Sequence, residues 1–311
     1  MPGHFKLVEL SKDVGLDDCY IFNTYRYFEL HKIPNASYIA LLNTDTNAII
    51  GVCHFTELEN KVFISPFRGT FAGPELLEDN FEALQAFLAL LEEALKQRDA
   101  RQIAFTAAPF QYNTLFSEQL ERAATGAGYA ITKNDPSYII EVNDAEFAEG
   151  INRNHHRNLK KCTSAGFIFK QVFTNHEMRQ VYDVIAANRR RKGYDISMTW
   201  EQIMQMQSLF ADGIYFFGAL HNKTIIAAAI CIRINADALY VFYWGDIPGY
   251  EHYSPVTFVA EGIYKFARQN HFKWLDAGSA SLNGQPIGGL IHFKEGLGFV
   301  ASRKLTYAKT L

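Results

Sequence analysis

A dense group of basic residues is the first feature of this 311-residue sequence that could do chemistry. Residues 153–192 contain ten lysines and arginines but only two acidic residues, a net charge of +8 in a chain whose total is −3, so the remainder carries −11. Arg153, Arg157 and Lys160 stand at i, i+4 and i+7, the spacing of one helical face. Together with Arg191, these side chains suit a phosphate group, and the alternative is an ordinary solvated face.

A second candidate lies at the end of the apolar segment LYVFYWGD. Tyr243 and Trp244 fall on opposite faces of an extended strand, so one of them can line a site as a proton donor or stacking surface. A strand tyrosine is otherwise a core residue. Gly245 would let a ligand approach the strand closely. Asp246 would orient an amine or act as a base, unless it only forms the following turn.

The elements that must position these residues occur twice. Residues 38–73 and 215–249 each contain three apolar, β-branched or aromatic runs separated by short polar turns, and a one-residue gap brings them into register. Each stretch predicts three antiparallel strands. An amphipathic helix follows each of them, at residues 80–98 and 255–270, because large apolar residues recur there at helical spacing.

Each predicted helix leads to a short strand, at residues 101–107 and 272–278, and then to a second helix that ends in a glycine turn. The order in both halves is therefore β-β-β-α-β-α-β, with a right-handed crossover between the third and fourth strands. Neighbouring strands can separate where antiparallel pairing gives way to such a crossover, and ligands of open sheets favour crevices at strand ends. Between the halves we expect helices at residues 144–165, 175–192 and 199–209, and a strand at residues 167–173.

The doubled order resembles the GNAT acyltransferase fold in tandem, an α/β class with mixed sheets. The second half is similar to the Fem-type aminoacyl- and peptidyltransferases and to the BioF2-like acetyltransferases. Four stretches carry this resemblance: NRNHHRNLKKCTSAGFIFKQV, VIAANRRRKGYDISMTWEQI, LYVFYWGD, and FKWLDAGSAS followed by IHFKEGLGF. The resemblance implies two GNAT-like domains, residues 1–145 and 146–311.

The resemblance also implies roles for single residues. Lys294 matches a family lysine near the reacting groups, where its charge neutralises a phosphate or carbonyl, and its alternative is a surface lysine. In GNAT-type sites, the backbone of the separated central strand stabilises the carbonyl oxygen, which here means residues 243–245. Asp276 faces the same site or caps the next turn. Arg68, in the first-half loop SPFRGTFAG, could close on the phosphate from the other side.

The donor is left open between an acyl-CoA such as acetyl-CoA and an aminoacyl-tRNA. Ordinary GNAT enzymes hold the CoA pyrophosphate with an Arg/Gln-x-x-Gly-x-Gly/Ala loop at a helix N-terminus. Neither residues 68–77 nor residues 246–255 fit that pattern well. Fem-type enzymes that use aminoacyl-tRNA also lack the strict loop, but the sequence has no heptad hairpin like the arm that some of them carry. Their nucleotide-linked or lipid-linked substrates make a small-molecule or cell-wall-precursor-like acceptor the expected partner.

Composition excludes other classes. A net charge of −3 argues against extended nucleic-acid binding, apart from a tRNA donor or a small footprint. No apolar run approaches the ~20 residues that span a bilayer, and the N-terminus lacks an apolar signal core, so we expect a cytoplasmic protein. The 4 cysteines and 10 histidines form no metal-binding pattern, and the cysteines have no motif typical of a nucleophile.

These observations predict an enzyme. We expect an N-acyltransferase that moves an acyl or aminoacyl group to an amine of a phosphate-bearing acceptor by direct attack in a ternary complex. The alternative is a catalytically degenerate module of the same fold that binds an anionic, phosphorylated ligand.

Overall fold

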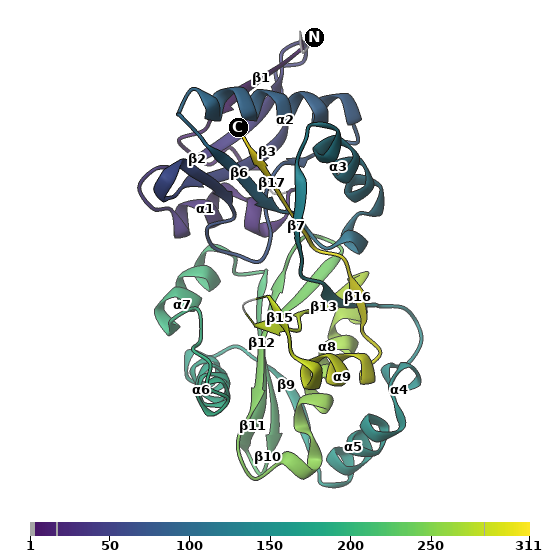
Figure 1. The fold of residues 1–311 in the computed structure, drawn as a ribbon. Coiled ribbons are helices and arrows are strands. Elements are labelled where there is room, and N and C mark those ends of the chain that lie inside the picture. The colour runs from purple at the N-terminus through teal and green to yellow at the C-terminus, as the bar shows by residue number, and fades with distance from the viewer. Residues whose placement is uncertain (1–3, 17, 283) are drawn as a thin grey trace. The chain divides into compact units, whose positions relative to one another are not determined.

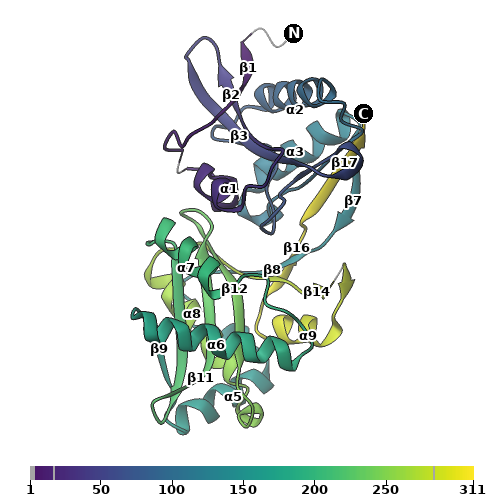
Figure 2. The ribbon, with the colours of Figure 1, turned by 90° about the vertical axis from the view of Figure 1, so that its left-hand side faces the viewer.

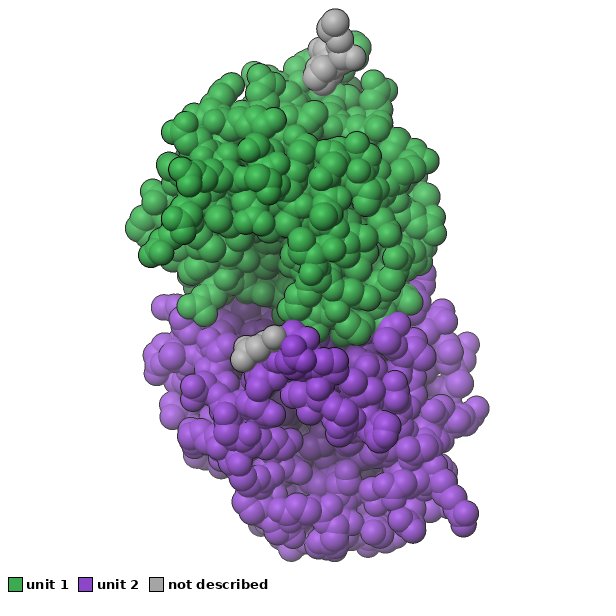
Figure 3. All heavy atoms as spheres, in the orientation of Figure 1, with its two compact units in different colours: residues 1–136, 302–311 green, residues 137–301 purple. Residues whose placement is uncertain are grey.

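The computed structural model describes residues 4–16, 18–282 and 284–311, which form two compact units. Unit 1 comprises residues 1–136 and 302–311, and unit 2 comprises residues 137–301 (Figure 3). The expected division between residues 145 and 146 differs from this one. The strand that follows Pro136 pairs within the sheet of unit 2, and the C-terminal strand pairs within the sheet of unit 1.

Unit 1 contains a mixed sheet in the order β1-β2-β3-β4-β6-β17-β7, with β5 paired to β3 (Figure 1). Its strands are β1 (Phe5–Glu9), β2 (Ala36–Asn43), β3 (Ala48–Glu57), β4 (Val62–Ser65), β5 (Glu75–Leu76), β6 (Gln102–Thr106), β7 (Ala130–Asn134) and β17 (Leu305–Thr310). Its helices are α1 (Tyr25–His31), α2 (Phe81–Lys96) and α3 (Thr114–Gly126), with short 3-10 turns η1 (Ile21–Asn23), η2 (Glu59–Lys61) and η3 (Phe110–Tyr112). The periodic leucines of α2 are buried in the core, as their spacing predicts.

Unit 2 contains a second mixed sheet in the order β16-β8-β13-β12-β11-β10-β9. Its strands are β8 (Ser137–Glu141), β9 (Ile168–Val172), β10 (Ile214–His221), β11 (Thr224–Arg233), β12 (Ala238–Asp246), β13 (Trp274–Ser279) and β16 (Val300–Ser302), with a hairpin of β14 (Ser281–Leu282) and β15 (Gln285–Pro286). Its helices are α4 (Phe147–Gly150), α5 (Arg153–Ser164), α6 (Asn175–Arg191), α7 (Trp200–Leu209), α8 (Pro255–Gln269), α9 (Gly288–Gly296) and the 3-10 turn η4 (Glu251–Tyr253).

The predicted duplication is confirmed. The order β2-β3-β4-α2-β6-α3-β7 in the first half matches β10-β11-β12-α8-β13-α9-β16 in the second. The two sheets also correspond strand by strand when one of them is read in reverse. In this correspondence β17 and β8 are equivalent, and each lies in the sheet formed mainly by the other half of the sequence. The two halves have therefore exchanged their last strands.

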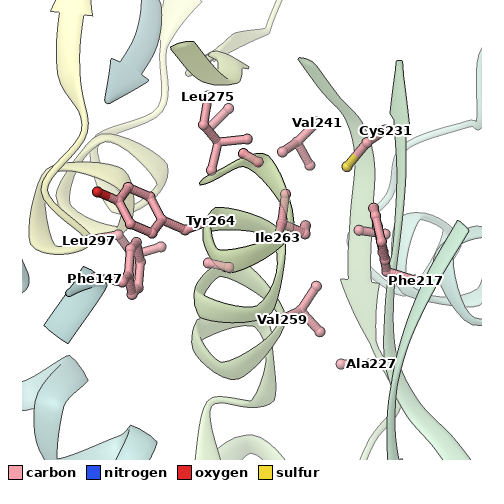
Figure 4. Close-up of a cluster of buried hydrophobic side chains, with 14 of the residues drawn as sticks. Phe147, Phe217, Ala227, Cys231, Val241, Val259, Ile263, Tyr264, Leu275 and Leu297 are labelled. Carbon is pink, nitrogen blue, oxygen red and sulfur yellow. The ribbon is translucent and has the colours of Figure 1, made fainter. Parts of the chain in front are cut away.

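Helices cover both faces of the sheet of unit 2. Helices α6 and α7 lie on one face, whereas α5, α8 and α9 lie on the other (Figures 1 and 2). Val259 and Ile263 of α8 are fully buried against residues such as Phe217 and Cys231 of the central strands (Figure 4). Gly262 lets α8 lie against Phe169 of β9, because a Cβ atom there would overlap the ring of Phe169.

One predicted helix is wrong. Residues 144–165 form α4 and α5 instead of one continuous helix. Ile151 and Asn152 have extended backbone between the two, and the side chain of Asn152 accepts a hydrogen bond from the N–H of His155, 3.0 Å away. Asn152 is therefore the N-cap that starts a new helix. The helices predicted near residues 175–192, 199–209 and 255–270 are confirmed.

Candidate functional site

The central strands of unit 2 separate at their carboxyl ends. Parallel pairing of β12 with β13 ends at Tyr240 and Asp276, although β12 continues to Asp246 and β13 to Ser279. Phe242 is the extra residue of a β-bulge in β12, since the register with β11 shifts between Val241 and Tyr243. Within the described residues, no strand pairs with the edge of β12 that this separation exposes. Backbone amide groups on such an edge can donate hydrogen bonds to a ligand.

The equivalent position in unit 1 is closed by the chain itself. All four residues of β4 pair with β6, and β4 then ends at Ser65. The loop that follows returns to the sheet, where the N–H of Ala72 donates to the carbonyl oxygen of Thr106 at 2.8 Å. A Cβ atom on Gly73 would lie 2.8 Å from the ring of Phe105, and β5 then pairs with β3. The separated strands are therefore a feature of unit 2, and the candidate site lies there.

Lys294 lies beside this separation. Its side chain is 1% exposed, which excludes the surface lysine considered as its alternative. The ammonium group donates to the carbonyl oxygens of Gly278 and Ser279, each at 2.8 Å, and lies 5.4 Å from the centre of the Tyr138 ring. Its positive charge is thus held at the end of β13, where β13 has left β12.

Asp276 closes the turn beneath Lys294. It is 1% exposed, and its carboxylate accepts a hydrogen bond from the N–H of Gly278 at 2.6 Å. Gly278 has a φ of 74°, and a Cβ atom there would lie 3.0 Å from the hydroxyl of Tyr240. This geometry agrees with the capping alternative for Asp276.

Tyr243 and Trp244 point to opposite faces of the sheet, as the strand pattern predicts. The hydroxyl of Tyr243 is hydrogen-bonded to that of Ser197, and the Arg189 guanidinium lies 5.2 Å from its ring centre, so this tyrosine faces α6. Burial raises the pKa of Tyr243 above its ordinary value. Trp244 packs instead against Phe293 of α9, with ring centres 5.8 Å apart.

Asp246 and Gly245 are both engaged by α6. The carboxylate of Asp246 accepts hydrogen bonds from Asn188 at 2.6 Å and from Arg191 at 2.7 Å. A Cβ atom on Gly245 would lie 2.7 Å from Cβ of Asn188. The expectation that Gly245 admits a ligand is therefore corrected, because its open side is filled by the helix. In the sequence, Gly245 is the only sign of this close contact with α6. The contacts made by Asn188 and Ser197 were not predicted.

The basic residues of the segment 153–192 do not form one patch. Arg153, Arg157 and Lys160 are exposed on α5, and Arg157 donates to the side chain of Asn154 at 2.9 Å. Arg191 belongs to α6, on the opposite face of the sheet (Figure 2). The α5 residues and Arg191 therefore cannot hold the same anion. Arg68 lies in unit 1 and is exposed.

The N-terminus of α8, where a GNAT enzyme would hold the CoA pyrophosphate, is partly satisfied from within the chain. Pro255 has no N–H, and the N–H of Thr257 donates to the carbonyl of Ser254. Glu251 accepts a hydrogen bond from the N–H of Gly249 at 2.9 Å. Hydrogen bonds from its own backbone and from Gly249 hold the pKa of Glu251 below its ordinary value. A carboxylate thus takes the place of an incoming anion in this loop.

Helix α5 covers the same end of α8. The ring of His155 is hydrogen-bonded to the hydroxyl of Thr257 at 2.9 Å, and Lys161 donates to the carbonyl of His252 at 3.1 Å. Burial lowers the pKa of His155, so its ring is neutral at physiological pH. Thr257 is 0% exposed. The residues present do not fit a CoA pyrophosphate.

Comparison with known proteins places this geometry in a fold family. The crystal structure of FemX superposes with a TM-score of 0.70, at 13% identity, over 94% of this chain and 92% of that one. The C-terminal domain of a putative lysylphosphatidylglycerol synthetase from Agrobacterium fabrum has a TM-score of 0.62, at 12% identity, over 93% of this chain and 88% of that one. A tandem GNAT protein from the clavulanic acid biosynthesis pathway has a TM-score of 0.54, at 9% identity, over 98% of both chains.

The chain has a Fem-type, tandem GNAT-like fold. No model of a known protein family matches the sequence, and neither does any curated protein. Within the described residues, no helix combines the length and apolar character that crossing a membrane requires. The same residues contain no group of three or more histidine, cysteine, aspartate or glutamate side chains that could hold a metal ion.

Proposed function

We propose that the protein is an aminoacyl- or acyltransferase that uses the separated strands of unit 2 as its reaction site. The observation that carries the proposal is the buried Lys294 at the point where β12 and β13 part. A fixed cation and an unpaired strand edge together provide what acyl transfer needs, which is a preorganised positive potential around a carbonyl oxygen.

The reaction would proceed by direct attack. An amine of the acceptor attacks the donor carbonyl, whose oxygen becomes negative beside the exposed edge of β12. Lys294 stabilises this charge through its field while its own hydrogen bonds hold it in place. The bond to the leaving oxygen or sulfur then breaks, the new amide forms, and the proton of the amine goes to the leaving group. The acceptor is expected to carry a phosphate, as a cell-wall precursor or lipid does.

For the donor, we propose an aminoacyl ester such as aminoacyl-tRNA in preference to acyl-CoA. The loop before α8 keeps several of its amide groups in internal hydrogen bonds and carries the Glu251 carboxylate. A pyrophosphate brought there would meet like charge and few free donors. The name of the putative lysylphosphatidylglycerol synthetase is consistent with aminoacyl transfer within this fold.

A transfer assay tests the proposal. The full chain is incubated with charged tRNA or acyl-CoA and with phosphorylated amine acceptors, and the new amide is detected by mass spectrometry. Lys294→Met keeps the length and apolar stem of the side chain and is expected to lower kcat/KM by roughly 100-fold or more. Lys265→Met removes an outer lysine of α8 that pairs with Glu261 and should have little effect. A Lys294→Met variant that melts like the parent and turns over at the parent rate would refute this role for Lys294.

One observation favours a second candidate function, a binding module without transfer. Tyr243 and Asp246, the two other residues considered for catalysis, are both held by contacts with α6 and its following loop. Binding of a phosphorylated ligand with no amide product from any donor would support this alternative.

A further inference from the structure

A hollow in unit 1 lies outside the site described above. It is bounded by α1, by β3 and by the loop after β4, and its lining includes Tyr27, His31, His54, Phe67 and Arg68. Its volume is about 220 Å³, most of it open to solvent, and its enclosed part has room for about one water molecule. We call this hollow the His31–Arg68 pocket.

His31 brings an unsatisfied ring nitrogen to this pocket. Its Nε2 atom is buried and has no hydrogen-bond partner among the described residues. The ring is fixed in place by Tyr27, whose ring centre is 4.6 Å away. Burial, together with the positive charge of Arg68, lowers the pKa of His31 to about 4. The ring is therefore neutral at physiological pH and can present an N–H to an acceptor.

Arg68 brings a charge that the protein does not neutralise. Its side chain is exposed, and its guanidinium lies 5.6 Å from the centre of the Phe67 ring. Within the part of the chain that the structure describes, no carboxylate lies at ion-pair distance from it. Lys32, the other cation of the lining, is paired with Glu29 at 3.4 Å. A planar donor fork and a buried ring nitrogen thus border one pocket that contains no acidic side chain in its lining.

We propose that the His31–Arg68 pocket binds a phosphate group, with one oxygen taking the enclosed position next to Nε2 of His31 and two others facing the guanidinium of Arg68. A tetrahedral phosphate offers oxygens in both directions at once, and arginine matches two of them with parallel N–H bonds. A carboxylate has only two oxygens, both in one plane, so it cannot offer two oxygens to Arg68 and a third to His31. The inference goes beyond the proposed function, because it assigns a phosphate site to unit 1, and it concerns binding and not transfer.

A titration of the full chain followed by NMR of the histidine ring nitrogens tests this inference. The ligands are inorganic phosphate, glycerol 3-phosphate and acetate, each against potassium chloride at matched ionic strength. We expect both phosphates to shift the His31 signals and to saturate, with acetate at least tenfold weaker. Arg68→Gln should weaken phosphate binding at least tenfold. Arg101→Gln, an exposed arginine elsewhere in unit 1, should leave it unchanged.

Each outcome decides a separate question. Equal responses to phosphate and chloride, or an Arg68→Gln variant that binds as the parent does, would overturn the pocket as a phosphate site. Binding of inorganic phosphate without glycerol 3-phosphate would overturn its role for a phosphate carried on an organic ligand. The His31→Phe variant has no His31 ring signal, so its phosphate titration is followed by the NMR signals of the backbone amides. These signals should show no saturable response, while the melting temperature stays near that of the parent. Loss of transfer activity alone would count against the proposed function and leave this inference standing.

Discussion

Two buried ionisable side chains, Lys294 and Glu75, have different surroundings. Lys294 donates to two carbonyl oxygens, so its charge is solvated by backbone dipoles. Glu75 is buried in unit 1 and accepts from the N–H of Tyr20 at 2.9 Å and from Asn23 at 2.7 Å. These two bonds favour its charged form, but burial outweighs them and raises the pKa of Glu75 to about 7. We therefore expect a carboxyl group that loses its proton near neutral pH inside the core.

Glu75 makes the stability of unit 1 dependent on pH. Because its pKa in the folded chain exceeds the unfolded value of 4.5, its contribution is full below pH 4.5 and is lost as the pH rises through about 7. Glu75→Gln should remove this loss, so the variant gains roughly 2–3 kcal/mol relative to the parent between pH 5 and pH 8. Urea unfolding at both pH values measures the effect, with the exposed Glu118→Gln as control. A parent and variant with parallel pH profiles would contradict the assignment.

At the scale of elements, close contacts between helices and strands determine where side chains can point. Gly245 allows Asn188 of α6 to lie against β12, and Gly262 allows the ring of Phe169 to lie against α8. One contact is on each face of the sheet, so β12 and its neighbours are held from both sides (Figure 2). Inside this sheet, the ends of β12 and β13 stay apart, because their pairing stops at Tyr240 and Asp276.

Gly262 offers a test of this packing. Gly262→Ala places a methyl group where the Phe169 ring lies and should destabilise the protein by about 1–3 kcal/mol, the usual cost of overpacking. Gly126→Ala, at the end of α3, meets no atom within 4 Å and should be neutral or slightly stabilising, since alanine favours helix. The double change Gly262→Ala with Phe169→Leu should recover part of the loss. Chemical denaturation of the parent and the three variants measures their free energies of unfolding. Equal effects of Gly262→Ala and Gly126→Ala would contradict the close contact between Gly262 and the Phe169 ring.

At the scale of the whole molecule, the sequence predicts the local elements well and their partners poorly. The repeated order of strands and helices follows from periodicity, which is a local property of the chain. The exchange of β8 and β17 does not follow from it, because a strand's pattern says which face is buried but not which sheet it joins. Lys294 was predicted by resemblance, yet its burial depends on carbonyl groups 15 and 16 residues away. Gly245 was misinterpreted because the absence of a side chain allows a helix to approach the strand as closely as a ligand would.

The exchanged strand β17 predicts how the chain responds to truncation. Removing residues 302–311 takes away the strand between β6 and β7, together with the buried Tyr307 and the bond from Lys309 to Glu92 at 2.6 Å. The amides of β6 and β7 should then lose hydrogen-exchange protection, whereas those of β10 and β11 keep theirs, since their sheet retains β8. Adding a synthetic peptide of residues 302–311 should restore protection in β6. Removing the edge strand β1 is the matched control, because β6 keeps both neighbours in that variant. If β6 kept full protection in the truncated chain, β17 would not be part of the cooperative core of unit 1.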